Sequence, residues 1–135
     1  MQRTSKTLHL SILVASREEK TFAAVQQIPA QNRMKFDWAG TGAQVLDAIR
    51  GNPIDLLIME ALLPDMTARD LTEQVVTANP SVYCAVAGAL EGKAFHQLYE
   101  GYGVLMQLPS VPQVRDIEIL LDKIKTIAGM GGTKR

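Results

Sequence analysis

The feature that most constrains this chain is a predominantly apolar run at residues 54–59, with Pro53 before it and Glu60 after it. A turn containing Pro64 follows, so the run has the length of a strand rather than of a helix. Because neighbouring residues of the run are apolar, both faces of this strand are expected to be buried. The sequence therefore predicts a central strand that carries the Glu60 carboxylate to the edge of a sheet.

Segments of two kinds alternate along the rest of the chain. Strand-like apolar segments lie at residues 8–15, 34–38, 54–60, 82–87 and 104–108. A segment with helical spacing of apolar residues follows each of them, beginning near residues 17, 41, 67, 91 and 111. Strict alternation with short connections predicts an α/β fold, in which helices cover both faces of a five-stranded parallel sheet. This is a doubly wound three-layer sandwich.

The helices are expected to bury the apolar residues that recur three or four positions apart. Thr41 and Thr67 stand where helix N-caps are expected. Residues 34–38 alternate apolar and polar side chains, which indicates a half-buried strand at a sheet edge. The predicted inner residues of the five helices are Phe22, Ala24, Val25 and Ile28; Val45, Leu46 and Ile49; Leu71, Val75 and Ala78; Phe95, Leu98 and Tyr99; and Ile117, Leu120, Leu121, Ile124 and Ile127 or Ala128.

Composition excludes several classes of protein. The chain has 135 residues with 14 basic and 14 acidic side chains, so its charge gives no reason to expect nucleic acid or an anionic membrane as a partner. The lone Cys84 excludes an internal disulfide framework and fits a reducing compartment. No apolar run approaches the roughly 20 residues that span a bilayer. We expect a cytoplasmic domain at residues 8–128, an N-terminal extension at 1–7, and a flexible tail or linker at 129–135.

The chain resembles the receiver domains of bacterial two-component response regulators over residues 8–128. The resemblance rests on residues 12–14 (ILV) and on residues 55–66 (DLLIMEALLPDM), which are similar to the family's phosphoacceptor segment D-L-x-L-x-D-x-x-L-P-x-M-x-G. Residues 100–103 (EGYG) and Pro109, on either side of the fifth predicted strand, support it. The resemblance implies the flavodoxin-like (βα)5 fold with strand order 2-1-3-4-5, and a role in signal transduction by phosphorelay.

The family's functional positions, carried over one by one, hold other residues here. Ser16 and Arg17 stand where receivers have two acidic residues that hold Mg²⁺. Glu60 stands at the phosphoacceptor aspartate. Ala87 replaces the hydroxyl residue that follows the fourth strand, and Leu108 replaces the lysine that precedes Pro109. The resemblance thus implies a degenerate receiver, or pseudo-receiver.

These replacements remove the chemistry of phosphoryl transfer, which depends on positioning and on neutralising charge with Mg²⁺ and cationic side chains. Glu60 beside a cationic Arg17 is a poor Mg²⁺ site, because the ion prefers several oxygen ligands. We expect no metal, no cofactor and no enzymatic activity. Arg17 and Glu60 either form an ion pair across the strand ends or are both solvated, and the sequence leaves these two arrangements open.

The remaining candidate function is protein–protein interaction, independent of aspartyl phosphorylation. By resemblance, the face formed by the fourth helix, the fifth strand and the fifth helix binds a protein partner or output domain, or forms a homodimer. Its candidate residues are Phe95, Tyr99, Tyr102 and Gln107, with Tyr99 and Tyr102 either exposed anchors or covers of the core edge. Two alternatives stay open: a competent receiver phosphorylated at Glu60 or elsewhere, and a small-molecule domain with a pocket at Ser16, Ala87 and Leu108.

Overall fold

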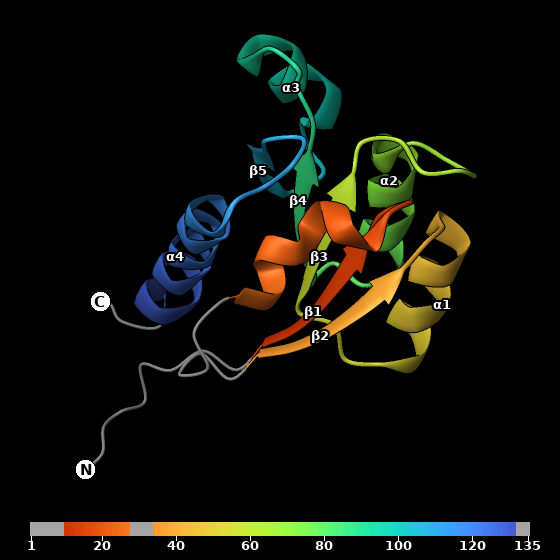
Figure 1. Cartoon of the computed structure of the whole chain (residues 1–135), viewed down its shortest axis with the longest axis horizontal. Helices are drawn as coiled ribbons and strands as arrows, with labels where there is room; N and C mark the ends of the chain where they lie inside the picture. Colours follow the sequence, from red (N-terminus) through yellow and green to blue (C-terminus); the bar gives the residue numbers. More distant parts are fainter. Residues whose placement is uncertain (1–9, 28–33, 132–135) are drawn as a thin grey trace.

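The computed structural model describes residues 10–27 and 34–131, with side chains to residue 127. Five parallel strands form one sheet in the order β2-β1-β3-β4-β5, which confirms the predicted topology (Figure 1). The elements in chain order are β1 (Leu10–Ala15), η2 (Glu19–Gln27), β2 (Met34–Ala39), α1 (Gly42–Gly51), β3 (Leu56–Glu60), α2 (Ala68–Ala78), β4 (Tyr83–Ala87), α3 (Gly92–Tyr99), β5 (Val104–Leu108) and α4 (Val114–Gly131).

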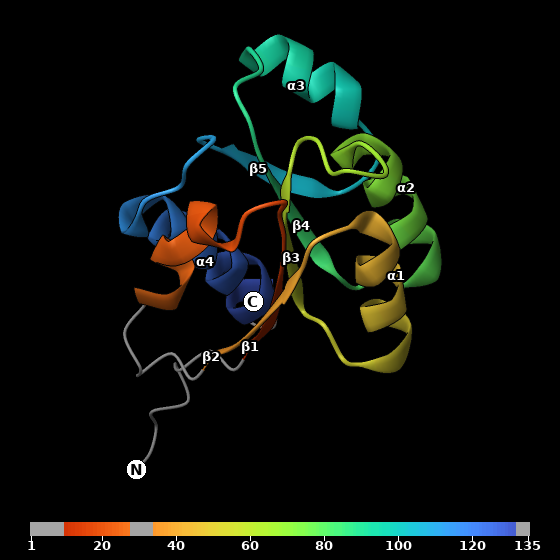
Figure 2. The ribbon, with the colours of Figure 1, turned by 45° about the vertical axis from the view of Figure 1, so that its right-hand side comes forward.

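Helices cover the two faces of the sheet, as the alternation predicts. α1 and α2 lie on one side, and η2 and α4 lie on the other (Figures 1 and 2). Each side has its own apolar core. Leu46 and Leu71 belong to the core under α1 and α2, while Phe22 and Leu120 belong to the core under η2 and α4. β3 separates the cores, and its residues Leu56 to Met59 have no exposed surface, which confirms the central buried strand.

Local sequence explains how the helices begin. Thr41 caps α1 by accepting a hydrogen bond from the Gln44 N–H, and Thr67 caps α2 by accepting one from the Asp70 N–H. Both caps were predicted. The first helix instead has 3-10 geometry and is kinked at Phe22, whose φ and ψ are −111° and 26°. A kinked 3-10 segment presents fewer side chains to the sheet than a regular α-helix of the same length.

α3 stands apart from the other helices, on the side of β5 (Figures 1 and 2). It buries Tyr99 and packs Phe95 partly against the core, with their ring centroids 4.9 Å apart. Leu98, the third apolar residue expected in this helix, is 43 % exposed. The pair at positions i and i+4 faces the sheet, and Leu98 lies on the flank of the helix.

Other differences occur where elements end. Ala78 and Ile127 were predicted to be inner residues but are exposed, since both lie in the last turns of helices that extend past the sheet. α4 continues to Gly131, so the helix includes residues 129–131, which we assigned to a tail. Residues 8 and 9, Ile28 and the side chain of Ala128 lie outside the described part of the chain. No helix within the described residues is long and apolar enough to cross a membrane.

Candidate functional site

The positions singled out from the sequence meet at the carboxyl ends of the strands. Glu60, the last residue of β3, lies in register with Ala87 of β4, and Ala87 lies in register with Leu108 of β5. Ser16 and Arg17 directly follow β1, which is the other neighbour of β3 in the sheet. Because the strands are parallel, their carboxyl ends lie at the same end of the sheet, so five residues from four separate segments of the chain form one site.

Arg17 and Glu60 form the ion pair that was one of the two predicted arrangements. The Arg17 Nη2 lies 3.0 Å from Glu60 Oε2, and the Arg17 backbone N–H donates to Glu60 Oε1 at 2.7 Å. One residue therefore binds both carboxylate oxygens, through its guanidinium and through its backbone. The Glu60 side chain is 18 % exposed and the Arg17 side chain is 53 % exposed, so the pair lies at the surface with its acidic partner mostly covered.

These contacts shift the pKa values of both groups. Partial burial alone raises the pKa of Glu60, but the hydrogen bonds from the Arg17 side chain and backbone, the Arg17 charge and Ser16 together lower it below its ordinary value. The hydrogen bond to Glu60 and the carboxylate charge raise the pKa of Arg17. Glu60 is therefore held in its ionised form, with the counter-charge supplied by the protein itself.

Ser16 completes the surroundings of Glu60. Its side chain is fully buried, and its Oγ lies 2.8 Å from the Glu18 carbonyl oxygen and 3.3 Å from Glu60 Oε1. The same Oγ accepts a hydrogen bond from the Glu18 backbone N–H at 3.1 Å. The serine hydroxyl thus fixes the turn that leads from β1 into η2, and this turn positions Arg17 against Glu60.

Ala87 and Leu108 are part of the core rather than of a cavity. Ala87 is 3 % exposed and Leu108 is fully buried, and both belong to the apolar core that packs under η2 and α4. With Ser16 also fully buried, these three residues do not provide the lining of an open pocket. The geometry therefore gives no support to a small-molecule site made of Ser16, Ala87 and Leu108.

The donor set does not suit Mg²⁺. Of the five positions, only Glu60 carries a carboxylate, and both of its oxygens are already bound by Arg17. A guanidinium 3.0 Å from the carboxylate would also lie close to any cation placed there, and like charges repel. Within the described residues, His, Cys, Asp and Glu side chains form no group of three that could hold a metal.

Sequence reasoning missed a second carboxylate that shapes the site. Asp65, in the turn after β3, accepts hydrogen bonds from the Gly42 N–H at 2.8 Å and the Ala43 N–H at 3.0 Å. These N–H groups belong to the first turn of α1, where a negative charge is favourable. The hydrogen bond from Gly42 is the main cause that lowers the pKa of Asp65. No local sequence signal links the two segments, because their contact exists only in the folded chain.

Gly42 packs closely against the same turn. A Cβ built on Gly42 would lie 2.5 Å from the Met66 Sδ. The turn that carries Asp65 and Met66 therefore packs closely on the start of α1, through the Met66 side chain and the hydrogen bonds of Asp65.

The predicted interaction residues have partners within the chain. Tyr99 is 6 % exposed and covers the core, which was one of its two predicted roles. The Tyr102 hydroxyl is 2.7 Å from Arg69 Nη2, and the Arg69 guanidinium carbon lies 4.9 Å from the centre of the Tyr102 ring. The Gln107 side-chain amide binds both the N–H and the carbonyl of Leu90, at 2.9 and 2.8 Å. These contacts order the connection around α3.

Apolar side chains are exposed on α4, and also at Leu90 and Leu98 around α3. Ile119 and Ile127 of α4 are 42 % and 46 % exposed. With Val104 and Leu105 they line a shallow groove of about 740 Å³ between β5, the edge strand, and α4. A second shallow region beside β4 and α2 shares Leu105 and Ile127 with this groove. We call the groove lined by Val104, Leu105, Ile119 and Ile127 the β5–α4 groove.

Comparison with solved structures identifies the fold. No protein-family model matches the chain, and no curated protein is similar to it in sequence. Solved structures are similar in shape. The signal receiver domain of an HD domain-containing protein from Pseudomonas fluorescens Pf-5 superposes with a TM-score of 0.73 at 19 % identity, covering 96 % of this chain and 94 % of that one.

Two further structures agree with it. The receiver domain of HemR from Leptospira biflexa, in its non-phosphorylated form, has a TM-score of 0.72 at 21 % identity and covers 85 % of this chain and 93 % of its own. The chemotaxis response regulator CheY4 of Vibrio cholerae has a TM-score of 0.75 at 13 % identity and covers 86 % and 98 %. The fold of this chain is therefore that of response regulator receiver domains, as the sequence predicts.

Proposed function

We propose that this chain is a pseudo-receiver: a non-catalytic signalling domain of two-component type that acts by protein–protein interaction and independently of aspartyl phosphorylation. The observation that carries the proposal is the binding of both Glu60 carboxylate oxygens by Arg17. The place that a metal ion and a phosphoryl group would need is filled by a cationic side chain of the protein.

The surroundings of Glu60 support a fixed link rather than a switch. A phosphoryl group on Glu60 would have to displace the Arg17 backbone hydrogen bond, and Ala87 and Leu108 at the neighbouring strand ends offer neither a hydroxyl nor a charge. A switch of this kind needs groups that bind the modified state better than the unmodified state. Of the five site residues, Arg17 alone supplies a positive charge, and it already stabilises the unmodified carboxylate.

The alternative, a competent receiver, is tested with a phosphorylation assay. The protein is incubated with Mg²⁺ and a small-molecule phosphodonor, and its intact mass is measured over time beside Glu60→Gln as the matched control. We expect no phosphoryl adduct on either protein. A stoichiometric adduct on the wild type that is lost in Glu60→Gln would show that Glu60 is a phosphoacceptor and would overturn the proposal.

For the interaction itself, we assign the β5–α4 groove as the surface that meets a protein partner or output domain. Val104, Leu105, Ile119 and Ile127 provide adjacent apolar side chains on it, and β5 is an edge strand whose outer backbone groups have no neighbouring strand in the sheet. Contiguous exposed apolar surface of this kind is typical of interaction sites. A second copy of the chain is one such partner, and the molar mass in solution distinguishes it from a different protein.

A further inference from the structure

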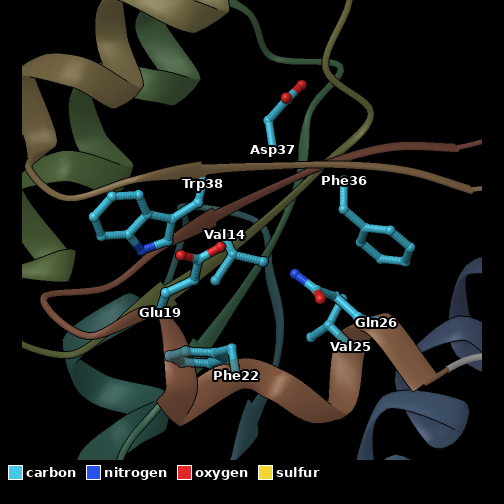
Figure 3. Close-up of a pocket in the computed structure, with 8 residues that line it drawn as sticks. All are labelled: Val14, Glu19, Phe22, Val25, Gln26, Phe36, Asp37 and Trp38. Carbon is cyan, nitrogen blue, oxygen red and sulfur yellow. The ribbon is translucent and has the colours of Figure 1, made fainter.

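A small cavity lies between η2 and β2, on the opposite edge of the sheet from the β5–α4 groove (Figure 3). Its volume is about 60 Å³, which accommodates a few water-sized groups but not a nucleotide or a ring system. Three aromatic side chains contribute to its lining: Phe22 from η2, and Phe36 and Trp38 from β2. The site is far too small for a typical cofactor and has the size of a single ionic head group.

The polar lining is acidic. Glu19 and Asp37 are the charged residues around the cavity, and Gln26 is the neutral polar one. In Figure 3 the Glu19 carboxylate lies between the rings of Trp38 and Phe22, whereas Asp37 points to the other side of β2. Neither carboxylate forms an ion pair with a basic group among the described residues. The cavity therefore combines aromatic rings with an exposed carboxylate that has no basic partner within residues 10–27 and 34–127.

Trp38 is held in position although it is 45 % exposed. Its indole N–H donates a hydrogen bond to the Ser16 carbonyl oxygen at 3.0 Å. On the other side the ring lies against Gly40, where a built Cβ would be 3.3 Å from the ring carbon Cη2. Strand alternation places Phe36 on the same face of β2 as Trp38. These contacts orient the aromatic side chains before any ligand arrives, which lowers the cost of binding.

We propose that this cavity binds an ammonium head group, either a lysine side chain of a partner protein or a small organic amine. The faces of aromatic rings attract cations, with tryptophan the most effective, and the Glu19 carboxylate adds a direct charge contact. An anion would be repelled by Glu19 and Asp37. A neutral group would gain no charge contact with Glu19.

The test uses the fact that Trp38 is the only tryptophan of the chain, so its fluorescence reports on the cavity alone. The protein is titrated at constant ionic strength with butylammonium and, in parallel, with butanol as the neutral analogue. We expect a saturable change in Trp38 emission with butylammonium and none with butanol. The absence of saturable binding, or an equal response to butanol, would overturn the proposal.

A pair of variants tests the role of charge. Glu19→Gln should weaken butylammonium binding about fivefold, the loss expected for a partly exposed cation contact. Glu18→Gln removes the same charge from the neighbouring residue, which does not line the cavity, and should leave affinity unchanged. Equal effects of the two substitutions would reduce the interaction to general electrostatic attraction and would contradict a specific site.

The two sources of the head group are separated with a blocked Gly-Lys-Gly tripeptide and its Gly-Gln-Gly counterpart. Tighter binding of the lysine peptide than of butylammonium assigns the site to a lysine side chain of a protein. Tighter binding of butylammonium assigns it to a free amine. Both results support an ammonium site, whereas equal binding of the lysine and glutamine peptides together with no binding of butylammonium contradicts it.

Discussion

Two regions of the molecule differ in how much of their surface is already bound within the chain: the carboxyl ends of β1 and β3, and the β5–α4 groove. At the ends of β1 and β3, the Glu60 carboxylate is bound through both oxygens by Arg17, and Leu108 is packed into the core. At the β5 edge, Ile119 and Ile127 leave more than two-fifths of their surface in contact with solvent. The strand ends are thus occupied by the chain's own side chains, whereas the β5–α4 groove presents apolar surface to solvent. The two regions therefore differ in how far their side chains are already bound within the chain.

The largest expected effect comes from placing a lysine at position 108, at the closed strand ends. Leu108→Lys places a charge at a fully buried position and should destabilise the fold by about 3 kcal/mol or more. The matched control, Leu108→Met, keeps the volume and should cost less than about 1.5 kcal/mol. Urea unfolding measures both. Near-equal stabilities of the two variants would mean that position 108 is open to water, which would contradict the claim that the strand ends are closed.

Removing the charge of Glu60 has a smaller effect. Glu60→Gln weakens the contacts with Arg17 and should lower the free energy of unfolding at neutral pH by about 1 kcal/mol, because the pair is partly screened by solvent. Arg17→Ala should destabilise the wild type but have little further effect in the Glu60→Gln background. A double-mutant cycle measured by urea unfolding gives the coupling, and strict additivity would show that the pair is not a structural link.

The pH dependence of stability follows from two lowered pKa values, those of Glu60 and Asp65. A carboxyl group whose pKa is lower in the folded state stabilises the protein above its unfolded pKa, and this contribution is lost as the pH falls through the folded pKa. Stability should therefore decline below about pH 4, near the ordinary carboxyl pKa. The combined Glu60→Gln and Asp65→Asn variant should show a flatter decline in thermal unfolding curves. An identical slope in the variant would contradict the assigned shifts.

Substitutions in the β5–α4 groove should change the stability of the fold least and its interaction with a partner most. The double variant Ile119→Gln and Ile127→Gln changes exposed side chains, so its stability should stay within about 0.5 kcal/mol of the wild type for each substitution. Its binding to a partner or to a second copy should be lost. Light scattering and affinity capture measure this, with Leu62→Gln as a control on an equally exposed apolar residue outside the β5–α4 groove. Unchanged binding would show that the β5–α4 groove is not the interaction surface.

Features governed by local sequence were predictable. The alternation of patterns predicted five strands in a parallel sheet, and the N-caps at Thr41 and Thr67 follow from residue type and position. The strand order 2-1-3-4-5 was implied by the resemblance to receiver domains, and the structure confirms it. The segment around Glu60 also aligned the chain with receiver domains, and the positions chosen from that alignment lie together at the carboxyl ends of the strands. The sequence alone could not choose between a paired and a solvated Arg17, since the choice depends on the turn that Ser16 holds.

Features that depend on tertiary contacts were not predictable. Asp65 caps a helix that begins 23 residues earlier in the chain, and no spacing rule links such positions. The 3-10 geometry of η2 and the aromatic cavity beside it arise from how that segment packs on β1 and β2. Whether Tyr99 or Leu98 faces the core depends on a small rotation of α3, to which helical periodicity is insensitive.

The most direct test of the central claim is the response of Arg17 and Glu60 to the ligands of a working receiver. NMR spectra of the Arg17 backbone and guanidinium N–H groups and of the Glu60 carboxyl carbon are recorded with and without millimolar Mg²⁺ and a phosphodonor. We predict that these resonances stay in place and that the Glu60 pKa rises in Arg17→Ala. A saturable Mg²⁺-dependent shift of both residues would contradict the claim that protein charge permanently fills this site.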